Sequence, residues 1–126
     1  MDLSKAFDTI NHELMIAKLS AYGLDKNSLK IILSYLKDRW QRTKIDTTFS
    51  SWSQLLQGVP QGSVLGPILF NIYLNDLFFL LKETEVCNYA DDTTPYACEE
   101  SLKNVMLRLE HDSDTAICWF ESNYMK

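Results

Sequence analysis

The chain has 126 residues, a formal net charge of −5 and a composition of 46% hydrophobic and 23% charged residues. This length fits one domain or a part of one, and the composition is that of a globular protein rather than a disordered chain. Four glycines and three prolines exclude collagen-like and linker-rich classes. No apolar run approaches the roughly 18 residues that a membrane span needs, so no membrane partner is expected.

The three cysteines, Cys87, Cys98 and Cys118, are odd in number and form no Cys-x-x-Cys pair. A zinc site or a disulfide framework is therefore not expected. Reduced, partly buried thiols are typical of an intracellular protein, and the first residues lack the apolar segment of a signal peptide. The sequence thus predicts an intracellular location, in the nucleus or the cytoplasm, and leaves the oligomeric state open.

Charge is unevenly distributed along the chain. The segment from residue 18 to 44 contains two acids and seven basic residues, which are Lys18, Lys26, Lys30, Lys37, Arg39, Arg42 and Lys44. From Asp76 onward, eleven acids stand against four bases. A basic segment next to an acidic one suits a polyanion held near metal ions, whereas solvated helix faces give the same pattern without any ligand.

The first predicted elements are a strand remnant at the start of the chain and two helices. Apolar residues at helical spacing predict a first helix that stops at Gly23; they are Leu14, Met15, Leu19 and Tyr22. Asp25 is placed to cap the second helix. The apolar face of this second helix comprises Leu29, Ile32, Leu33, Leu36 and Trp40. From residue 42 to 56, β-branched and aromatic residues with pairs of serines predict a β-hairpin.

Residues 58–66 form a glycine-rich loop, and Pro67 suits the first position of the next helix, predicted over 67–81. This helix is apolar nearly all round, which is typical of a helix buried on most faces. Residues 86–97 predict two short strands that turn at Asp91 and Asp92, and a last helix starts near Glu99. The predicted fold class is α+β, an antiparallel sheet with helices packed on one face.

Asp91 and Asp92 are candidates for a metal site. Adjacent carboxylates repel one another unless a cation compensates, and Mg²⁺ prefers carboxylate oxygens while leaving positions for phosphates and water. Asp2 joins them only if its strand lies beside this turn, in which case two metal ions roughly 4 Å apart would align attacking and leaving oxygens. The alternatives are an exposed turn and, for Asp2, a solvated or capping residue.

The glycine-rich loop offers backbone N–H groups to a ligand, and Gln61 adds an amide that both donates and accepts. No Gly-Lys-Ser/Thr follows, so the loop is not a phosphate-binding P-loop, and a loop that only starts the buried helix is the alternative. Phe7 and Tyr89 lie next to the acids and suit either core packing or substrate contact. His12 has no set of His or Cys partners and is interpreted as a structural polar residue.

Three stretches occur in order: residues 2–8 (Asp-Leu-Ser-Lys-Ala-Phe-Asp), residues 58–67 (Gly-Val-Pro-Gln-Gly-Ser-Val-Leu-Gly-Pro) and residues 89–92 (Tyr-Ala-Asp-Asp). Their order closely resembles motifs A, B and C in the palm of reverse transcriptases. The longer stretches 2–12 and 57–77 are similar to the enzymes of non-LTR (LINE-type) retrotransposons. The resemblance runs over essentially the whole chain.

The resemblance implies a metal centre. Asp2 matches the first catalytic aspartate, and Asp91 and Asp92 match the pair of motif C. Together they would hold two Mg²⁺ ions, with Mn²⁺ as a substitute, and the carbonyl of Leu3 would complete one of the two sites.

The resemblance also implies residues that contact substrate. Phe7 matches the position that stacks under the sugar of the incoming nucleotide and selects against ribonucleotides. Gln61 and Gly62 match residues that contact the nucleotide and the template. Tyr89 matches the aromatic residue beside the primer end.

The implied activity is that of an RNA-directed DNA polymerase, which uses an RNA template, a DNA primer and a dNTP. Residues 1–126 are expected to be a partial reverse transcriptase domain with motifs A to C and the start of motif D. The fingers and thumb are expected to be absent, so the isolated chain is expected to be inactive. The alternatives are a catalytically dead retrotransposon remnant and an unrelated metal-binding or interaction module.

Overall fold

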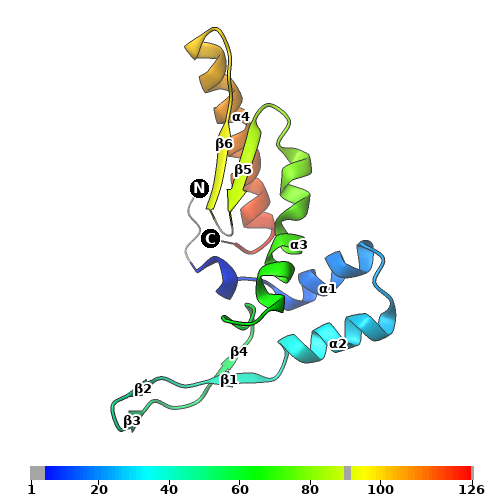
Figure 1. The fold of residues 1–126 in the computed structure, drawn as a ribbon, viewed down its shortest axis with the longest axis vertical. Coiled ribbons are helices and arrows are strands. Elements are labelled where there is room, and N and C mark those ends of the chain that lie inside the picture. Colours follow the sequence, from blue (N-terminus) through cyan, green and yellow to red (C-terminus); the bar gives the residue numbers. More distant parts are fainter. Residues whose placement is uncertain (1–4, 90–91, 126) are drawn as a thin grey trace.

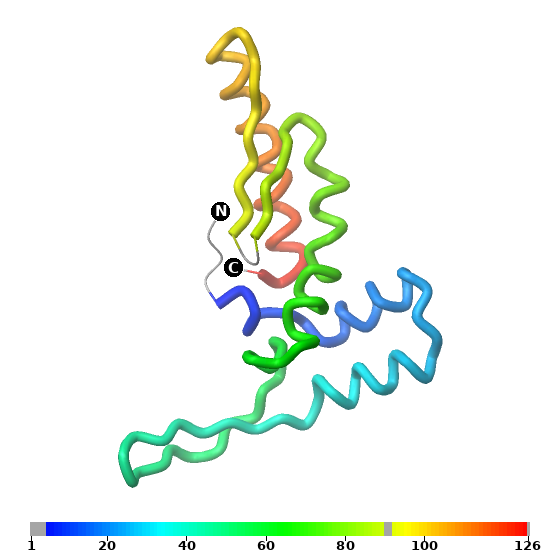
Figure 2. The backbone as a smooth tube through the Cα atoms, in the orientation of Figure 1, coloured from blue at the N-terminus to red at the C-terminus, as the bar shows by residue number. Residues whose placement is uncertain are grey.

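The computed structural model describes residues 5–89 and 92–125 of the chain. It begins with a short 3-10 turn, η1 (Ala6–Asp8), followed by the helices α1 (His12–Ala21) and α2 (Lys26–Leu36). Figures 1 and 2 show α1 and α2 running side by side in opposite directions. The strand remnant predicted at the start of the chain lies outside the described residues.

Both helices begin at a side-chain cap. The side chain of Asn11 accepts a hydrogen bond from the N–H of Leu14 at 2.9 Å. Asp25 accepts one from the N–H of Asn27 at 2.8 Å, which confirms its predicted role as the cap of α2. At the end of α1, Gly23 takes a positive φ of 92°, so it ends this helix as expected.

The second helix is shorter than its apolar pattern predicts. It ends at Leu36, after which Lys37 is extended and Asp38 takes a left-handed φ of 57°. Trp40 therefore lies in a strand, with 56% of its surface exposed, and its predicted place on the helix face is wrong. The left-handed residue turns the chain out of the helix before the next apolar position is reached.

The predicted hairpin is present and projects away from the helices (Figure 1). At its base, β1 (Arg39–Gln41) pairs with β4 (Ser53–Leu55) in antiparallel register. Near its tip, β2 (Lys44–Ile45) pairs with β3 (Thr48–Phe49).

The glycine-rich loop leads into α3 (Leu65–Leu80), which begins before Pro67. The hydroxyl of Ser63 accepts from the N–H of Gly66 at 3.0 Å and so holds the first turn. Pro67 thus occupies a later position of that turn, where an N–H would still lack an intrahelical partner. One side of α3 is buried, but Ile68 and Phe79 are 50% and 64% exposed. The helix is therefore buried on one side and not, as expected, on most faces.

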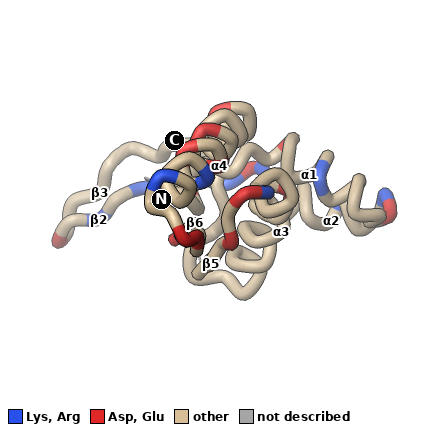
Figure 3. Tube along the Cα trace, turned by 90° about the horizontal axis from the view of Figure 1, so that it is seen from above, with Lys and Arg blue, Asp and Glu red and all other residues tan. Residues whose placement is uncertain are grey.

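The C-terminal part consists of β5 (Glu85–Tyr89), β6 (Asp92–Tyr96) and α4 (Leu102–Ser122). β5 and β6 pair in antiparallel fashion, and Figures 1 and 3 show α4 on one side of this ribbon. The fold is α+β, as predicted. Within the described residues the strands form three two-stranded ribbons rather than one continuous sheet.

The core lies where α1, α3 and α4 meet, and the partly buried Lys18 lies at its edge. Lys18 of α1 donates to Asp76 of α3 at 2.6 Å, and its ammonium lies 4.6 Å from the ring centroid of Trp119 on α4. Burial lowers the pKa of Lys18, against the opposing effect of Asp76. The buried Tyr73 hydroxyl donates to the carbonyl of Asn123, and burial raises the pKa of Tyr73 to about 12, so this hydroxyl stays protonated.

No helix among residues 5–89 and 92–125 is long and apolar enough to cross a membrane. All three cysteines are exposed, which corrects the expectation of partly buried thiols. Cys87 belongs to β5 and Cys118 to α4, and Cys98 lies in the segment between β6 and α4.

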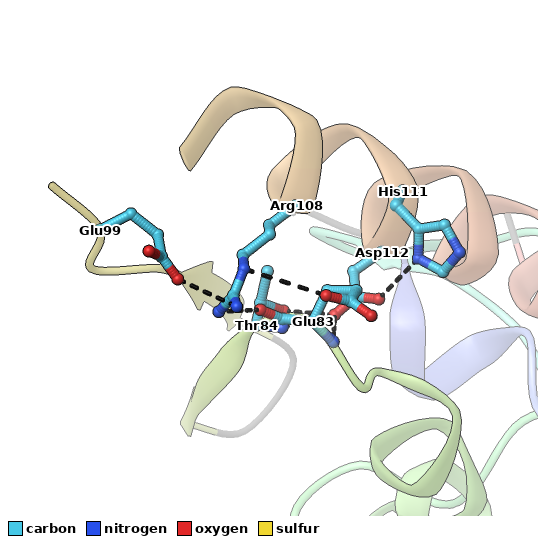
Figure 4. A network of polar contacts seen from close by, with 6 residues as sticks. All are labelled: Glu83, Thr84, Glu99, Arg108, His111 and Asp112. Atoms are coloured by element: carbon cyan, nitrogen blue, oxygen red, sulfur yellow. Dashed lines mark hydrogen bonds and ion pairs between the residues drawn. The ribbon is translucent and has the colours of Figure 1, made fainter. Parts of the chain in front are cut away.

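A buried carboxylate fixes the turn between α3 and β5 (Figure 4). Asp112 of α4 has no exposed surface and accepts hydrogen bonds from the N–H of Glu83, the N–H of Thr84 and the hydroxyl of Thr84, at 2.7–3.0 Å. Burial opposes ionisation, but these donors and His111 outweigh it and hold the pKa of Asp112 below its usual value. Arg108 extends the network to Glu99 at 2.9 Å.

We expect Asp112→Asn to destabilise the fold at pH 7 by roughly 1.5–3 kcal/mol, because an amide replaces a carboxylate that accepts charge-assisted hydrogen bonds. Since the pKa of Asp112 is lower in the folded state, its stabilisation is complete above the unfolded-state pKa and is lost as the pH falls through the folded-state pKa. Urea unfolding at pH 7 and at pH 3 measures both. A difference in unfolding free energy between the wild-type chain and Asp112→Asn that stays constant from pH 7 to pH 3 would contradict the lowered pKa of Asp112.

Candidate functional site

The segment before α1 and the glycine-rich loop before α3 lie side by side. The N–H of Gly58 donates to the carbonyl of Ile10 at 2.8 Å, and the N–H of Val59 donates to the carbonyl of Phe7 at 2.9 Å. His12 is 5% exposed, and its Nε2 lies 2.7 Å from the carbonyl oxygen of Gly58. A carbonyl only accepts, so Nε2 carries the proton in this contact. His12 is thus a structural residue, as interpreted, and it holds the glycine-rich loop through the carbonyl of Gly58.

Gly58 is required by the closeness of these two segments. Its φ is +86°, and a Cβ atom at this position would lie 2.8 Å from the Cα of Asp8. Both the backbone conformation and the lack of space therefore exclude other residues. Gly62 also has a positive φ, of +77°, but a Cβ there would meet nothing within 4 Å.

The side chains of the two segments also meet. Nε2 of Gln61 donates to Oδ1 of Asp8 at 2.9 Å, on the exposed side of the contact. A groove of about 790 Å³ opens beside this pair, between the loop and the base of the hairpin. It is lined by residues from the loop, the hairpin and the segment before α1, including Lys5, Asp8, Arg39, Gln54 and Gln61. The arrangement offers a carboxylate, several amides and two cations to a polar ligand.

Phe7 faces the interior. It is partly buried, and its ring stacks on that of Phe70 with centroids 4.4 Å apart. Phe70 is fully buried on α3, so this contact ties the first motif to the helix that follows the second. Core packing, one of the two alternatives for Phe7, therefore accounts for part of its surface, and its contact with substrate stays a prediction.

The two described residues of the third motif lie at one end of the β5–β6 ribbon. Tyr89, the last residue of β5, is 84% exposed, so it is not a core residue. Asp92, the first residue of β6, is the register partner of Tyr89 and is also exposed. Nδ2 of Asn88 donates to the hydroxyl of Thr93 at 2.8 Å, which holds the two strand ends together.

Three residues of the expected metal centre, Asp2, Leu3 and Asp91, lie outside the described residues, so a centre that joins Asp2 to the paired aspartates stays a prediction. Among residues 5–89 and 92–125, no group of three His, Cys, Asp or Glu side chains is arranged to hold a metal ion. Of the expected ligands, the structure describes only Asp92. Its carboxylate is the kind of donor that Mg²⁺ prefers.

Sequence reasoning missed Asp8, although it belongs to the first motif. The sequence could have indicated it, because Asp8 is a second acid on the same short segment as Asp2 and Phe7. Sequence reasoning also gave no role to Asp112, because its partners are backbone groups of a turn far away in the chain.

Comparison with known proteins defines the class. Residues 1–119 match the family described as reverse transcriptase (RNA-dependent DNA polymerase). The chain belongs to this family, which confirms the resemblance drawn from the three motifs.

Particular relatives come from transposable elements. The chain is 31% identical over 85 residues to a retrovirus-related Pol polyprotein from the type-1 retrotransposable element R2 of Popillia japonica, with 68% of the chain covered. It is 30% identical over 129 aligned positions to the RNA-directed DNA polymerase from the mobile element jockey of Drosophila melanogaster, with 97% covered. The chain spans 14% of the length of each of these two relatives.

We expect Gly58→Ala to destabilise the fold by more than about 2 kcal/mol, because it combines a left-handed backbone with a clash against Asp8. Gly62→Ala is the matched control. It has the same backbone cost but no clash, so a loss of about 1 kcal/mol is expected. Denaturant unfolding of both variants measures the difference, and equal losses would show that the two segments are not in close contact.

Proposed function

We propose that this chain is the palm core of an RNA-directed DNA polymerase from a non-LTR (LINE-type) retrotransposon. In the complete enzyme, it would support the transfer of a nucleotide from a dNTP to the 3′-hydroxyl of a DNA primer on an RNA template. The observation that carries the proposal is the direct pairing of the first motif with the second, through Phe7 and Val59, in a chain that matches the reverse transcriptase family.

Asp2, Asp91 and Asp92 are the proposed ligands of two Mg²⁺ ions, for which Mn²⁺ would substitute, and the Leu3 carbonyl is a further ligand. The exposed carboxylate of Asp92 supports this assignment, because it makes no ion pair with any described residue and leaves oxygens open to a cation. Bound metal ions would make the primer hydroxyl more acidic and neutralise charge on the triphosphate.

The other proposed roles concern binding. Phe7 would pack under the sugar of the incoming nucleotide, and its stacking on Phe70 supports this role by fixing the position of the ring. Gln61 and Gly62 would contact the nucleotide and the template; the hydrogen bond from Gln61 to Asp8 supports this by orienting the amide beside the groove. The exposed ring of Tyr89 would lie beside the primer end.

The second candidate is a chain without catalytic activity of its own. It is favoured by the share of the relatives that the chain spans, 14% in each of the two described above. Polymerases orient template, primer and nucleotide with several regions, and correct positioning contributes on the order of 7–11 kcal/mol to lowering a barrier. A fragment of the machinery would forfeit much of that.

Millimolar Mg²⁺ or Mn²⁺ is expected to raise the melting temperature of the chain, because an ion that binds only the folded state stabilises it. At ten times the dissociation constant, the gain is about 1.4 kcal/mol. Asp91→Asn is expected to stabilise the metal-free fold slightly and to abolish the response, since an amide relieves the carboxylate repulsion and is a poorer ligand. Thermal melts with and without metal measure both effects.

Asp114→Asn is the control for the metal experiment. Asp114 is an exposed acid on α4, so its loss changes the net charge equally without touching the proposed centre. An equal metal response in the wild-type chain, Asp91→Asn and Asp114→Asn would refute the assignment of the paired aspartates as ligands.

In a primer-extension assay with Mg²⁺, an RNA template and a DNA primer, the 126-residue chain alone is expected to give no templated product, because the positioning described above is incomplete. Extension that disappears in Asp91→Asn would contradict this expectation. It would show that residues 1–126 suffice for the reaction.

A further inference from the structure

We propose that the projecting hairpin binds single-stranded RNA. The basic hairpin is defined here as residues 37–55, and it lies apart from the β5–β6 ribbon (Figure 1). It contains Lys37, Arg39, Arg42 and Lys44 against Asp38 and Asp46, whereas the whole chain carries a net charge of −5. The inference rests on the proposed function only in its choice of RNA as the strand.

Large aromatic rings accompany the cations. Trp40, Phe49 and Trp52 are 56%, 47% and 57% exposed, although burial of such rings is a main source of folding free energy. Among residues 40–54 of the hairpin, every side chain is exposed, so these rings belong to no core. Bases of a single strand stack on exposed rings of this kind.

The cations are held against the rings. The guanidinium of Arg42 lies 3.9 Å from the ring centroid of Phe49 and 4.6 Å from that of Trp52, and the ammonium of Lys44 lies 5.5 Å from Phe49. Lys44 and Phe49 are also register partners across β2 and β3. The hairpin therefore presents positive charge and aromatic surface together, which matches the phosphates and bases of one strand.

Charge complementarity favours a polyanion over a protein partner. A protein surface that covered the hairpin would take Arg42 and Lys44 out of water, which costs free energy unless acids are supplied for both. Phosphates supply that charge at every nucleotide, and they release counterions when cations bind them. Most acids of the chain lie in the β5, β6 and α4 region, away from the basic hairpin (Figure 3).

The hairpin also leads to the candidate site. The groove beside Gln61 and Asp8 is lined by Arg39, Gln41 and Gln54 from the base of the same hairpin. A strand bound along the basic hairpin would thus continue into the groove next to the glycine-rich loop without leaving a surface of this chain.

The test is fluorescence anisotropy with a labelled 15-nucleotide uridine RNA and the 126-residue chain, in EDTA and at low salt. Arg42→Ala/Lys44→Ala is expected to weaken binding at least tenfold and to reduce the slope of log affinity against log salt by about 1.4, from two lost phosphate contacts. Lys26→Ala/Lys30→Ala removes the same charge from exposed positions on α2 and is expected to change affinity less than about threefold.

The rings have a separate readout. Trp40 and Trp52 are exposed, and Trp119 is only 6% exposed. RNA is expected to quench the tryptophan emission of the wild-type chain, and the quenching is expected to disappear in Trp40→Phe/Trp52→Phe, which retains rings at both positions. Trp52→Ala is expected to weaken RNA binding about tenfold through lost stacking.

Several outcomes would overturn the inference. They are the absence of binding at 100 µM chain, equal losses in the hairpin and α2 variants, and equally tight binding of double-stranded RNA. A concentration-dependent dimer that dissociates in Arg42→Ala/Lys44→Ala, without RNA binding, would assign the hairpin to a second copy instead. RNA binding is measured in EDTA and therefore does not depend on the proposed metal centre. A failure of the RNA-binding proposal is thus distinguishable from a failure of the metal-centre proposal, which the thermal melts with Asp91→Asn test independently.

Discussion

Two backbone hydrogen bonds, from Gly58 to Ile10 and from Val59 to Phe7, determine how the N-terminal motif sits against the rest of the protein. They bring together segments separated by about fifty positions, and each segment leads directly into a helix of the core. The two helices, α1 and α3, contact one another, and Phe7 stacks on Phe70 of α3. The absence of a side chain at Gly58 is the condition for the contact.

The remaining junctions are held by buried polar groups rather than by apolar packing alone. Lys18 joins three helices through Asp76 and the rings of Tyr73 and Trp119. Asp112 anchors the turn that starts β5, and through that strand it determines where Tyr89 lies. Each is satisfied by its partners, which is the condition for a buried charge to support a fold.

The helices and the hairpin were predictable, because their signals are local. Asp25 was correctly assigned as a cap, since capping needs only the residues that follow it. Trp40 was misplaced because helical spacing says nothing about Asp38, whose left-handed backbone ends the run. The three motifs identified the class of protein. The hydrogen bonds from Gln61 to Asp8 and from Thr84 to Asp112, however, join positions far apart in the sequence, and the spacing of apolar residues does not predict such contacts.

The basic hairpin is attached to the body at its base, and the side chains of residues 40–54 are all exposed. Lengthening a solvated hairpin leaves the core unchanged and adds mainly loop-closure entropy, about 0.6 kcal/mol for each doubling of a flexible loop. Shortening it is similarly inexpensive so long as Leu36 and Val59 keep their buried places. Insertions and deletions in this segment therefore disturb the fold little, so a change in its length would alter what the protein contacts without altering its core.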